Sequence, residues 1–269
     1  WTIPSTATRS CWSVPCCRCD RARCPRGCAA PPGNWNQKKL DAMIEISKLS
    51  KTFTLHNQAG AMIEVMRDAA LSVAPGECVG LVGASGAGKS TLMRMIYGNY
   101  LAASGRIIVG GVDVAKAAPR DILALRRETL GYVSQFLRVV PRVPTLDVVA
   151  EPLLALGVPQ AEAQARAADL LARLNIPRTL WNLSPTTFSG GEQQRVNIAR
   201  GFAHDYPALL LDEPTASLDA RNRAVVLDLI AAAKARGAAI VGIFHDTDAR
   251  EHVCDRVIDV AQFTPGMAA

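Results

Sequence analysis

A glycine-rich loop between an apolar run and a helix-forming run constrains the fold of this chain more than any other feature. Residues 77–82 are short and apolar, as a buried parallel strand should be. The loop Gly-Ala-Ser-Gly-Ala-Gly-Lys-Ser follows at 83–90, and a helical pattern covers 91–97. In this arrangement backbone N–H groups and a helix N-terminus surround a phosphate. The sequence therefore predicts an α/β fold with a phosphate-binding loop.

Each part of the loop has a chemical reason to contact a nucleotide. The glycines let backbone N–H groups approach phosphate oxygens without a Cβ clash. Lys89 can reach the β- and γ-phosphates, and the Ser90 hydroxyl can ligate Mg²⁺. A chance glycine turn is the alternative, but further motifs follow in order. The expected ATP-binding residues here are Gly83, Ala84, Ser85, Gly86, Ala87, Gly88, Lys89, Ser90 and Thr91.

Two carboxylates follow a second apolar run. Residues 208–211 read as a strand covered on both faces, and Asp212 and Glu213 come next. Ligands of α/β folds bind where parallel strands end. We expect Asp212 to hold Mg²⁺, directly or through water, and Glu213 to be the general base that takes a proton from the attacking water. A solvent-facing acidic strand end is the alternative, which the following segment 214–219 disfavours.

A second helix start can also bind an anion. A serine and two glycines open a helical pattern, and serine is a favoured N-cap residue. The N–H groups and the dipole of a helix N-terminus attract negative charge. Because Lys89 already occupies one face of the phosphates, this start is expected to contact a nucleotide on an opposing subunit. Its expected contact residues are Ser189, Gly190, Gly191 and Glu192.

Together, these motifs resemble those of the ATP-binding cassette (ABC) ATPases, from Met43 to about Val260. The resemblance implies a P-loop nucleoside-triphosphatase fold with a RecA-like core and a helical subdomain. It also implies hydrolysis of ATP with Mg²⁺, at sites completed only when two cassettes meet. The signature departs from its commonest form by having Phe188 for Leu and Glu192 for Gln, which leaves the serine and glycines in place. The gap between the phosphate-binding loop and this signature is too short to contain the long coiled arm that DNA-repair relatives insert there.

The resemblance gives roles to residues that carry no signal alone. Gln135 matches the glutamine that contacts Mg²⁺ and reports the nucleotide to a partner protein. His245 matches the histidine that contacts the γ-phosphate. Asp219 ends the segment that crosses the dimer interface, the D-loop. Phe53 is the candidate for the aromatic ring that stacks on adenine, where the family more often has Tyr; a core role is the alternative.

The composition of the chain changes at Met43, where the expected domain begins. Residues 43–269 form the expected ABC domain, with a helical subdomain at about 135–187. Residues 1–42 contain six of the eight cysteines and carry seven Lys or Arg against two Asp. They lack apolar periodicity and an apolar signal core. We expect a disordered or non-native extension; a native disordered arm and a metal or redox site are the alternatives.

Composition narrows the classes of partner. The extension carries +5 of the total charge of +6, so the rest is only +1 and gives no indication of nucleic-acid binding. No apolar stretch reaches the length of about 18 residues expected of a membrane span. The remaining cysteines, Cys78 and Cys254, fit a reduced compartment. We expect a cytoplasmic protein without a membrane span or a nucleic-acid partner.

A narrower resemblance is to the L subunit of the bacterial carbon–phosphorus lyase system. It rests mainly on residues 134–142, 187–202 and 236–246. It implies an ATP-binding component of phosphonate breakdown, linked to the synthesis of α-D-ribose 1-methylphosphonate 5-triphosphate. The implied partners are soluble lyase subunits and a second cassette, either identical or paralogous.

Two other functions stay open. The chain could be the ATPase subunit that energises a membrane transporter for phosphonate or lipoprotein-like cargo. The loop after Gln135, where permease segments dock in this family, is the discriminating region. A scaffold that binds ATP without hydrolysis is disfavoured because Glu213 and His245 are both present.

Overall fold

The structure is a computed structural model that describes residues 42–55 and 60–265. The extension expected at 1–42 lies outside these residues apart from Ala42, so its nature stays a prediction. Within the described residues, no helix combines the length and the apolar character needed to cross a membrane.

An antiparallel sheet is formed mainly by the first part of the domain. Its four strands run in the order β2-β1-β4-β5, with β1 between two antiparallel neighbours. Their bounds are Ile44–Leu55 (β1), Ala61–Val73 (β2), Ser104–Val109 (β4) and Val112–Asp113 (β5).

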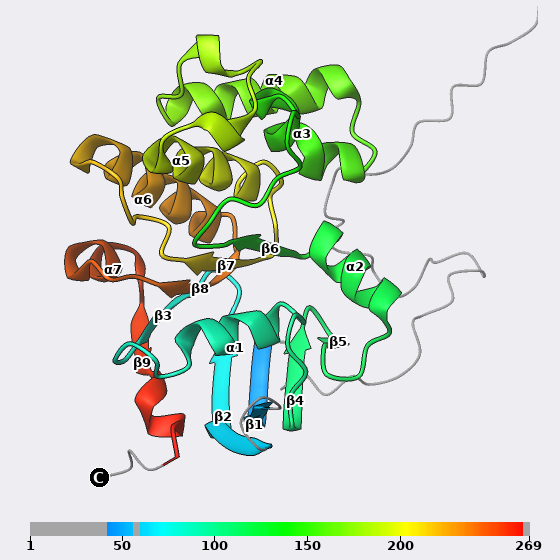
Figure 1. The fold of residues 1–269 in the computed structure, drawn as a ribbon, viewed down its shortest axis with the longest axis vertical. Helices are drawn as coiled ribbons and strands as arrows, with labels where there is room; N and C mark the ends of the chain where they lie inside the picture. Colours follow the sequence, from blue (N-terminus) through cyan, green and yellow to red (C-terminus); the bar gives the residue numbers. More distant parts are fainter. Residues whose placement is uncertain (1–41, 56–59, 266–269) are drawn as a thin grey trace, which may run out of the picture. The chain divides into compact units, whose positions relative to one another are not determined.

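A parallel sheet of five strands in the order β6-β7-β8-β3-β9 forms the centre of the domain (Figure 1). Its strands are Cys78–Val82 (β3), Leu130–Val133 (β6), Ala208–Asp212 (β7), Ala239–Ile243 (β8) and Arg256–Asp259 (β9). Asp212 at the end of β7 and Leu81 near the end of β3 both pair with Ile243 of β8. The register therefore brings the loops that follow these strands to one edge of the sheet.

Helices cover both faces of the parallel sheet (Figure 1). The α-helices are Lys89–Ile96 (α1), Pro119–Glu128 (α2), Thr145–Ala155 (α3), Gln160–Arg173 (α4), Gly190–Gly201 (α5), Ala220–Ala235 (α6) and Thr247–Val253 (α7). Short 3₁₀ helices occupy Arg178–Leu180, Pro185–Thr187 and Val260–Phe263. The segment expected to be mainly helical thus carries α3 and α4.

Strand β7 is buried on both of its faces. Ala208 and Leu210 pack into the core shared with α1 and the antiparallel sheet. Leu209 and Leu211 point to the opposite core, built with α5 and α6. All four are buried, and burying a Leu side chain contributes about 1.5–3 kcal/mol. A strand buried on both faces gives its last residue a fixed position.

The helical segment packs through one apolar face of α4. That face of α4 and the residue after it is fully buried, and consists of Ala163, Ala167, Leu170, Leu171 and Leu174. Pro159 lies at the N-cap rather than inside the first turn, because its backbone is extended at ψ 140°. Helices α3 and α4 pack on α5, which follows the serine–glycine signature.

Candidate nucleotide site

The phosphate-binding loop has the backbone that its glycines predict. Gly83, Gly86 and Gly88 have positive φ values of 132°, 84° and 94°. Gly88 is the N-cap of α1, and a Cβ at this position would lie 3.2 Å from Val65 Cγ1 on β2. The Lys89 ammonium donates to the carbonyls of Gly83 at 2.7 Å and Ala84 at 2.9 Å. The lysine therefore lies over the loop that it is expected to serve.

Asp212 is a buried carboxylate with one oxygen in use. The residue is 3% exposed, and its Oδ2 accepts a hydrogen bond of 3.1 Å from the Tyr132 hydroxyl. Its Oδ1 is buried and has no hydrogen-bond partner among the described residues. Burial raises the pKa of Asp212 above its usual range, and the Tyr132 hydrogen bond opposes this. A buried oxygen without a donor fits a Mg²⁺ ligand, with Ser90 as the second candidate at the start of α1.

Three loops converge on Glu213. Its Oε1 lies 2.7 Å from His245 Nε2, and its Oε2 accepts a hydrogen bond of 3.3 Å from Gln135 Nε2. Glu213 follows β7, His245 follows β8 and Gln135 follows β6, three parallel strands of the same sheet. The Glu213 side chain is 18% exposed and that of His245 is 71% exposed. The structure thus brings together all three side chains predicted to be catalytic.

The backbone of Glu213 is strained. Its φ is 54°, in the left-handed region that a residue with a Cβ rarely adopts. The Glu213 N–H donates to the Ile243 carbonyl at 3.0 Å, and its own carbonyl accepts from Gln194 Nε2 at 3.3 Å. These bonds fix the peptide groups on both sides of the strained residue, so its carboxylate has a defined direction.

Sequence reasoning missed two buried polar residues on α5. Gln194 holds the Glu213 carbonyl, and Asn197 Nδ2 donates to the Ser134 carbonyl at 2.5 Å, one residue before Gln135. Both are 6% exposed. The available signal was two amide side chains three positions apart, a spacing that places them on one face of the helix. Helix α5 therefore anchors two of the loops that meet at the site.

The serine–glycine signature begins α5 as predicted. Ser189 is the N-cap in a capping box: its Oγ accepts from the Glu192 N–H, and Glu192 Oε2 accepts from the Ser189 N–H at 2.9 Å. The Ser189 hydroxyl also donates to that carboxylate at 2.7 Å. Hydrogen bonds from the Ser189 side chain and backbone hold the pKa of Glu192 below its usual value. Ser189 and Gly190 are exposed, so this helix start is accessible to another molecule.

Asp219 caps the next helix, α6. Its carboxylate accepts from the backbone N–H of Asn222 at 2.7 Å and from the Asn222 side-chain amide at 3.0 Å. The backbone hydrogen bond is the main cause of the lowered pKa of Asp219. The D-loop candidate is therefore fixed to the first turn of α6.

Phe53 is half-buried on β1. Its ring meets that of Tyr100 edge to face, with centroids 5.5 Å apart, and the Lys51 ammonium lies 4.6 Å from its centroid. Phe53 pairs with Ile63 of β2, two residues from the Val65 side chain that touches the phosphate loop. The position near the loop fits the adenine-stacking prediction, which stays untested.

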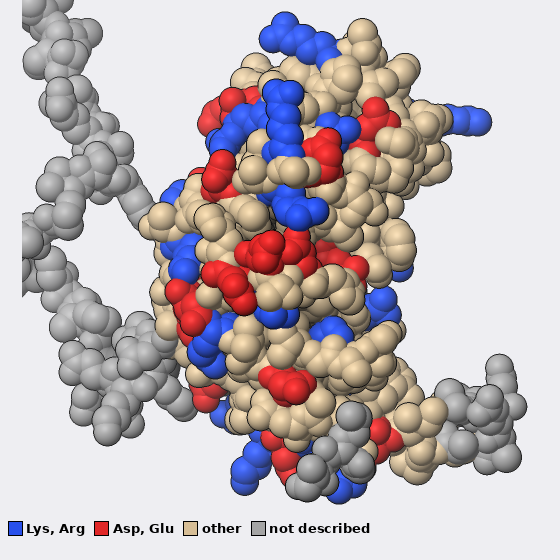
Figure 2. All heavy atoms as spheres, turned by 90° about the vertical axis from the view of Figure 1, so that its left-hand side faces the viewer, with Lys and Arg blue, Asp and Glu red and all other residues tan. Residues whose placement is uncertain are grey.

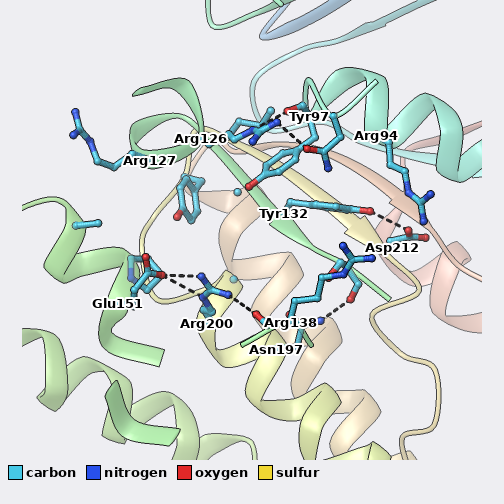
Figure 3. Close-up of a pocket in the computed structure, with 18 of the residues that line it drawn as sticks. Arg94, Tyr97, Arg126, Arg127, Tyr132, Arg138, Glu151, Asn197, Arg200 and Asp212 are labelled. Carbon is cyan, nitrogen blue, oxygen red and sulfur yellow. Dashed lines mark hydrogen bonds and ion pairs between the residues drawn. The ribbon is translucent and has the colours of Figure 1, made fainter. Parts of the chain in front are cut away.

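A cleft of about 500 Å³ adjoins the site, with Asp212 in its lining (Figure 3). Gln135 also lines this cleft. Its walls come from α1, α2, β6, α3, α5 and the loop between β6 and α3. They carry the arginines Arg94, Arg126, Arg127, Arg138 and Arg200. The exposed ring of Phe136 also lines it. These side chains are spread over a long stretch of sequence, so no local pattern predicted the cleft.

Comparison with known proteins identifies the family. The family model described as "ABC transporter" matches residues 66–216, more than half of the chain. The chain belongs to the ABC transporter family. A methionine import ATP-binding protein of Xanthomonas oryzae pv. oryzae is 39% identical over 216 residues, 80% of this chain and 63% of the relative. The lipoprotein-releasing system ATP-binding protein of Novosphingobium aromaticivorans is 39% identical over 191 residues, 70% of this chain and 82% of the relative.

Solved structures give the same result. The chain resembles the ATP-binding cassette MJ0796, described as a dimer in a post-hydrolysis state bound to ADP and phosphate. The TM-score is 0.74 at 25% identity, over 81% of this chain and 95% of that one. A second dimeric structure of the same bacterial cassette gives a TM-score of 0.75. The expected ABC nucleotide-binding fold is confirmed.

The comparisons support the expected ATPase activity of the family but not the expected link to carbon–phosphorus lyase. The cassettes of this family are ATPases, so the expectation of an ATPase is confirmed at the level of the family. The narrower resemblance to the carbon–phosphorus lyase subunit gains no support, because the relatives named above are transporter ATP-binding proteins. The chain spans 63% of the length of the methionine import protein.

Proposed function

We propose that this chain binds and hydrolyses Mg·ATP at a site completed by a second cassette, and that it energises a membrane transporter. The arrangement around Glu213 carries the proposal. A general base needs a carboxylate at the nucleotide edge of the sheet, and Glu213 lies there between His245 and Gln135. Cytoplasmic localisation is the compartment that this function requires.

Each residue at this edge has a role that follows from its chemistry. Lys89 and the loop N–H groups bind the β- and γ-phosphates. Ser90, Asp212 and Gln135 hold Mg²⁺, which neutralises charge that develops on the phosphate oxygens. Glu213 accepts a proton from the attacking water, and His245 orients the Glu213 carboxylate and contacts the γ-phosphate. Phe53 stacks on the adenine ring.

The exposed signature explains the need for a second cassette. Ser189 and Gly190 are accessible, and the Ser189 hydrogen bonds in the described residues run to Glu192 rather than to Lys89 or Glu213. The backbone N–H groups of Gly190 and Gly191, in the first turn of α5, can therefore approach the γ-phosphate bound to another subunit, and the dimeric MJ0796 structures support this arrangement.

Sedimentation of the Glu213→Gln protein, with and without Mg·ATP, tests the shared site. We expect ATP to produce a dimer, and Ser189→Arg to prevent it through bulk and charge while leaving ATP binding intact. An ATP-induced species that Ser189→Arg does not change contradicts the shared site.

The transporter assignment is supported by the names of the relatives and by the cleft beside Gln135. One relative is named for methionine import and another for lipoprotein release. The cleft opens next to a residue that contacts Glu213, and Phe136 at its edge is 71% exposed. A membrane subunit docked in this cleft would be separated from Glu213 by Gln135 alone.

Purification of the tagged native complex tests the assignment. We expect an integral membrane subunit to copurify, and Phe136→Asp to release it while basal ATP turnover stays unchanged. Copurification of soluble lyase subunits without a membrane subunit contradicts the transporter assignment.

Copurification of soluble lyase subunits is the result expected of a second candidate function, that of a soluble ATPase of the carbon–phosphorus lyase system. The observation that favours it is the sequence of residues 134–142, on which the narrower resemblance rests. Arg138 and Phe136 of this segment line the cleft, so a lyase subunit and a permease would contact the same surface.

A further inference from the structure

Arg223 joins two helices that flank the site. It lies in the first turn of α6, and its Nη1 is 2.5 Å from Asp246 Oδ2, at the N-cap of α7. Figure 2 looks onto the side of the molecule that carries α6 and α7, where acidic side chains gather beside basic ones. The two side chains are 40% and 26% exposed, and ion pairs this accessible contribute little to folding stability. We therefore interpret this ion pair as a contact that positions α7 relative to α6 rather than one that stabilises the fold.

The two oxygens of Asp246 have separate partners. Oδ1 accepts from the backbone N–H groups of Asp248 at 3.0 Å and Ala249 at 3.4 Å, which caps α7. Oδ2 receives Arg223. The cap sets the start of α7, and the ion pair sets the position of that start relative to α6. Asp246 directly follows His245, so the same turn presents the imidazole to Glu213.

The first turn of α6 is also joined to the signature helix. The Arg223 N–H donates to the Asp219 carbonyl at 2.9 Å, which places the D-loop and Arg223 in one helical turn. Asn222 Oδ1 accepts from Asn175 Nδ2 at 2.9 Å, just after α4. The Asn175 carbonyl accepts in turn from Arg195 of α5 at 2.7 Å. A continuous polar chain therefore runs from α5 to the residue beside His245.

We propose that Arg223 is a positioning residue for ATP turnover, which fixes the His245 turn to the first turn of α6 and so to the D-loop and the signature helix. Among the residues that the structure describes, the hydrogen bonds of Arg223 run to Asp246 and Asp219 and not to the phosphate-binding loop. The proposal rests on the proposed roles of Glu213 and His245, and it is independent of which partner protein the cassette serves.

Steady-state ATP turnover tests the proposal. Arg223→Gln removes the charge and is expected to lower kcat about tenfold, with the KM for ATP unchanged within about twofold. Arg223→Lys keeps a cation near Asp246 and is expected to restore at least about half of the turnover. Lys234→Gln is the matched control, because Lys234 in the last turn of α6 pairs with Asp255 at 2.6 Å, away from His245. It is expected to leave kcat unchanged.

A second variant separates positioning from folding. Asp246→Asn keeps an oxygen that can cap α7 but loses the charge that binds Arg223. It is expected to reproduce the kcat loss, and the double variant with Arg223→Gln is expected to be no worse than either single variant. Unchanged kcat in both single variants, equal loss in Lys234→Gln, or losses that multiply in the double variant would each overturn the proposal.

Glu213→Gln in the same assay distinguishes the two levels of inference. If it abolishes turnover while Arg223→Gln turns over normally, only the positioning role fails. If Glu213→Gln retains turnover, the proposed base fails and the role of Arg223 fails with it.

Discussion

The Tyr132 hydroxyl donates to Asp212 Oδ2 at 3.1 Å, between the adjacent strands β6 and β7. It is the donor that the structure gives to a carboxylate that is only 3% exposed. Because an unpaired buried carboxylate is costly, this hydroxyl stabilises the site before any metal binds.

Tyr132→Phe is therefore expected to lower the free energy of unfolding of the nucleotide-free protein by about 1–3 kcal/mol. Urea unfolding measures the change. Tyr97→Phe is the control, since the Tyr97 ring packs against that of Tyr132 with centroids 4.9 Å apart, but its hydroxyl makes no hydrogen bond to a residue in the described ranges. An equal loss in both variants would show that ring hydroxyls in general, rather than the bond to Asp212, account for the effect.

Gly88→Ala is expected to destabilise the domain by about 1–2 kcal/mol, because a φ of 94° is unfavourable for a residue with a Cβ. The added carbon also meets Val65 Cγ1 at 3.2 Å. Gly190→Ala is the matched change at the start of α5, where no atom lies within 4 Å, and it is expected to be neutral or stabilising. Thermal unfolding of both variants checks this, and similar melting temperatures would contradict it.

The capping box predicts a pH-dependent stability difference. The pKa of Glu192 is lowered in the folded protein, so its contribution is present above the unfolded value of 4.5 and is lost as the pH falls through the folded value. Glu192→Gln retains an acceptor but does not titrate. The free energy of unfolding of the wild type should exceed that of this variant by up to about 1 kcal/mol at pH 6, and the difference should shrink as the pH is lowered below 4.5. A gap that persists or widens in acid would be inconsistent with this.

Local patterns predicted much of the fold and the site. Apolar runs identified β3 and β7 because strands buried on both faces need apolar residues at every position. The glycine-rich loop and the Ser189 N-cap follow from backbone rules that act within a few residues. Glu213 was predictable because it follows directly from a recognisable strand.

Contacts between distant segments were not predictable. Gln194 and Asn197 reach the loops after β7 and β6 only because α5 packs beside those strands. Arg223 meets Asp246 across two helices whose relative position no local pattern specifies. Phe53 meets Tyr100 for the same reason, through the packing of β1.

The measurement that tests the central claim most directly is steady-state Mg·ATP turnover by purified wild-type and Glu213→Gln proteins, with ATP affinity measured on the same samples. Glu213 is held by His245 and Gln135 at the end of β7, so replacing its carboxylate removes the base without touching the phosphate loop. We predict unchanged ATP affinity and turnover lowered by about 10²–10⁴-fold. Turnover by Glu213→Gln equal to that of the wild type would contradict the account.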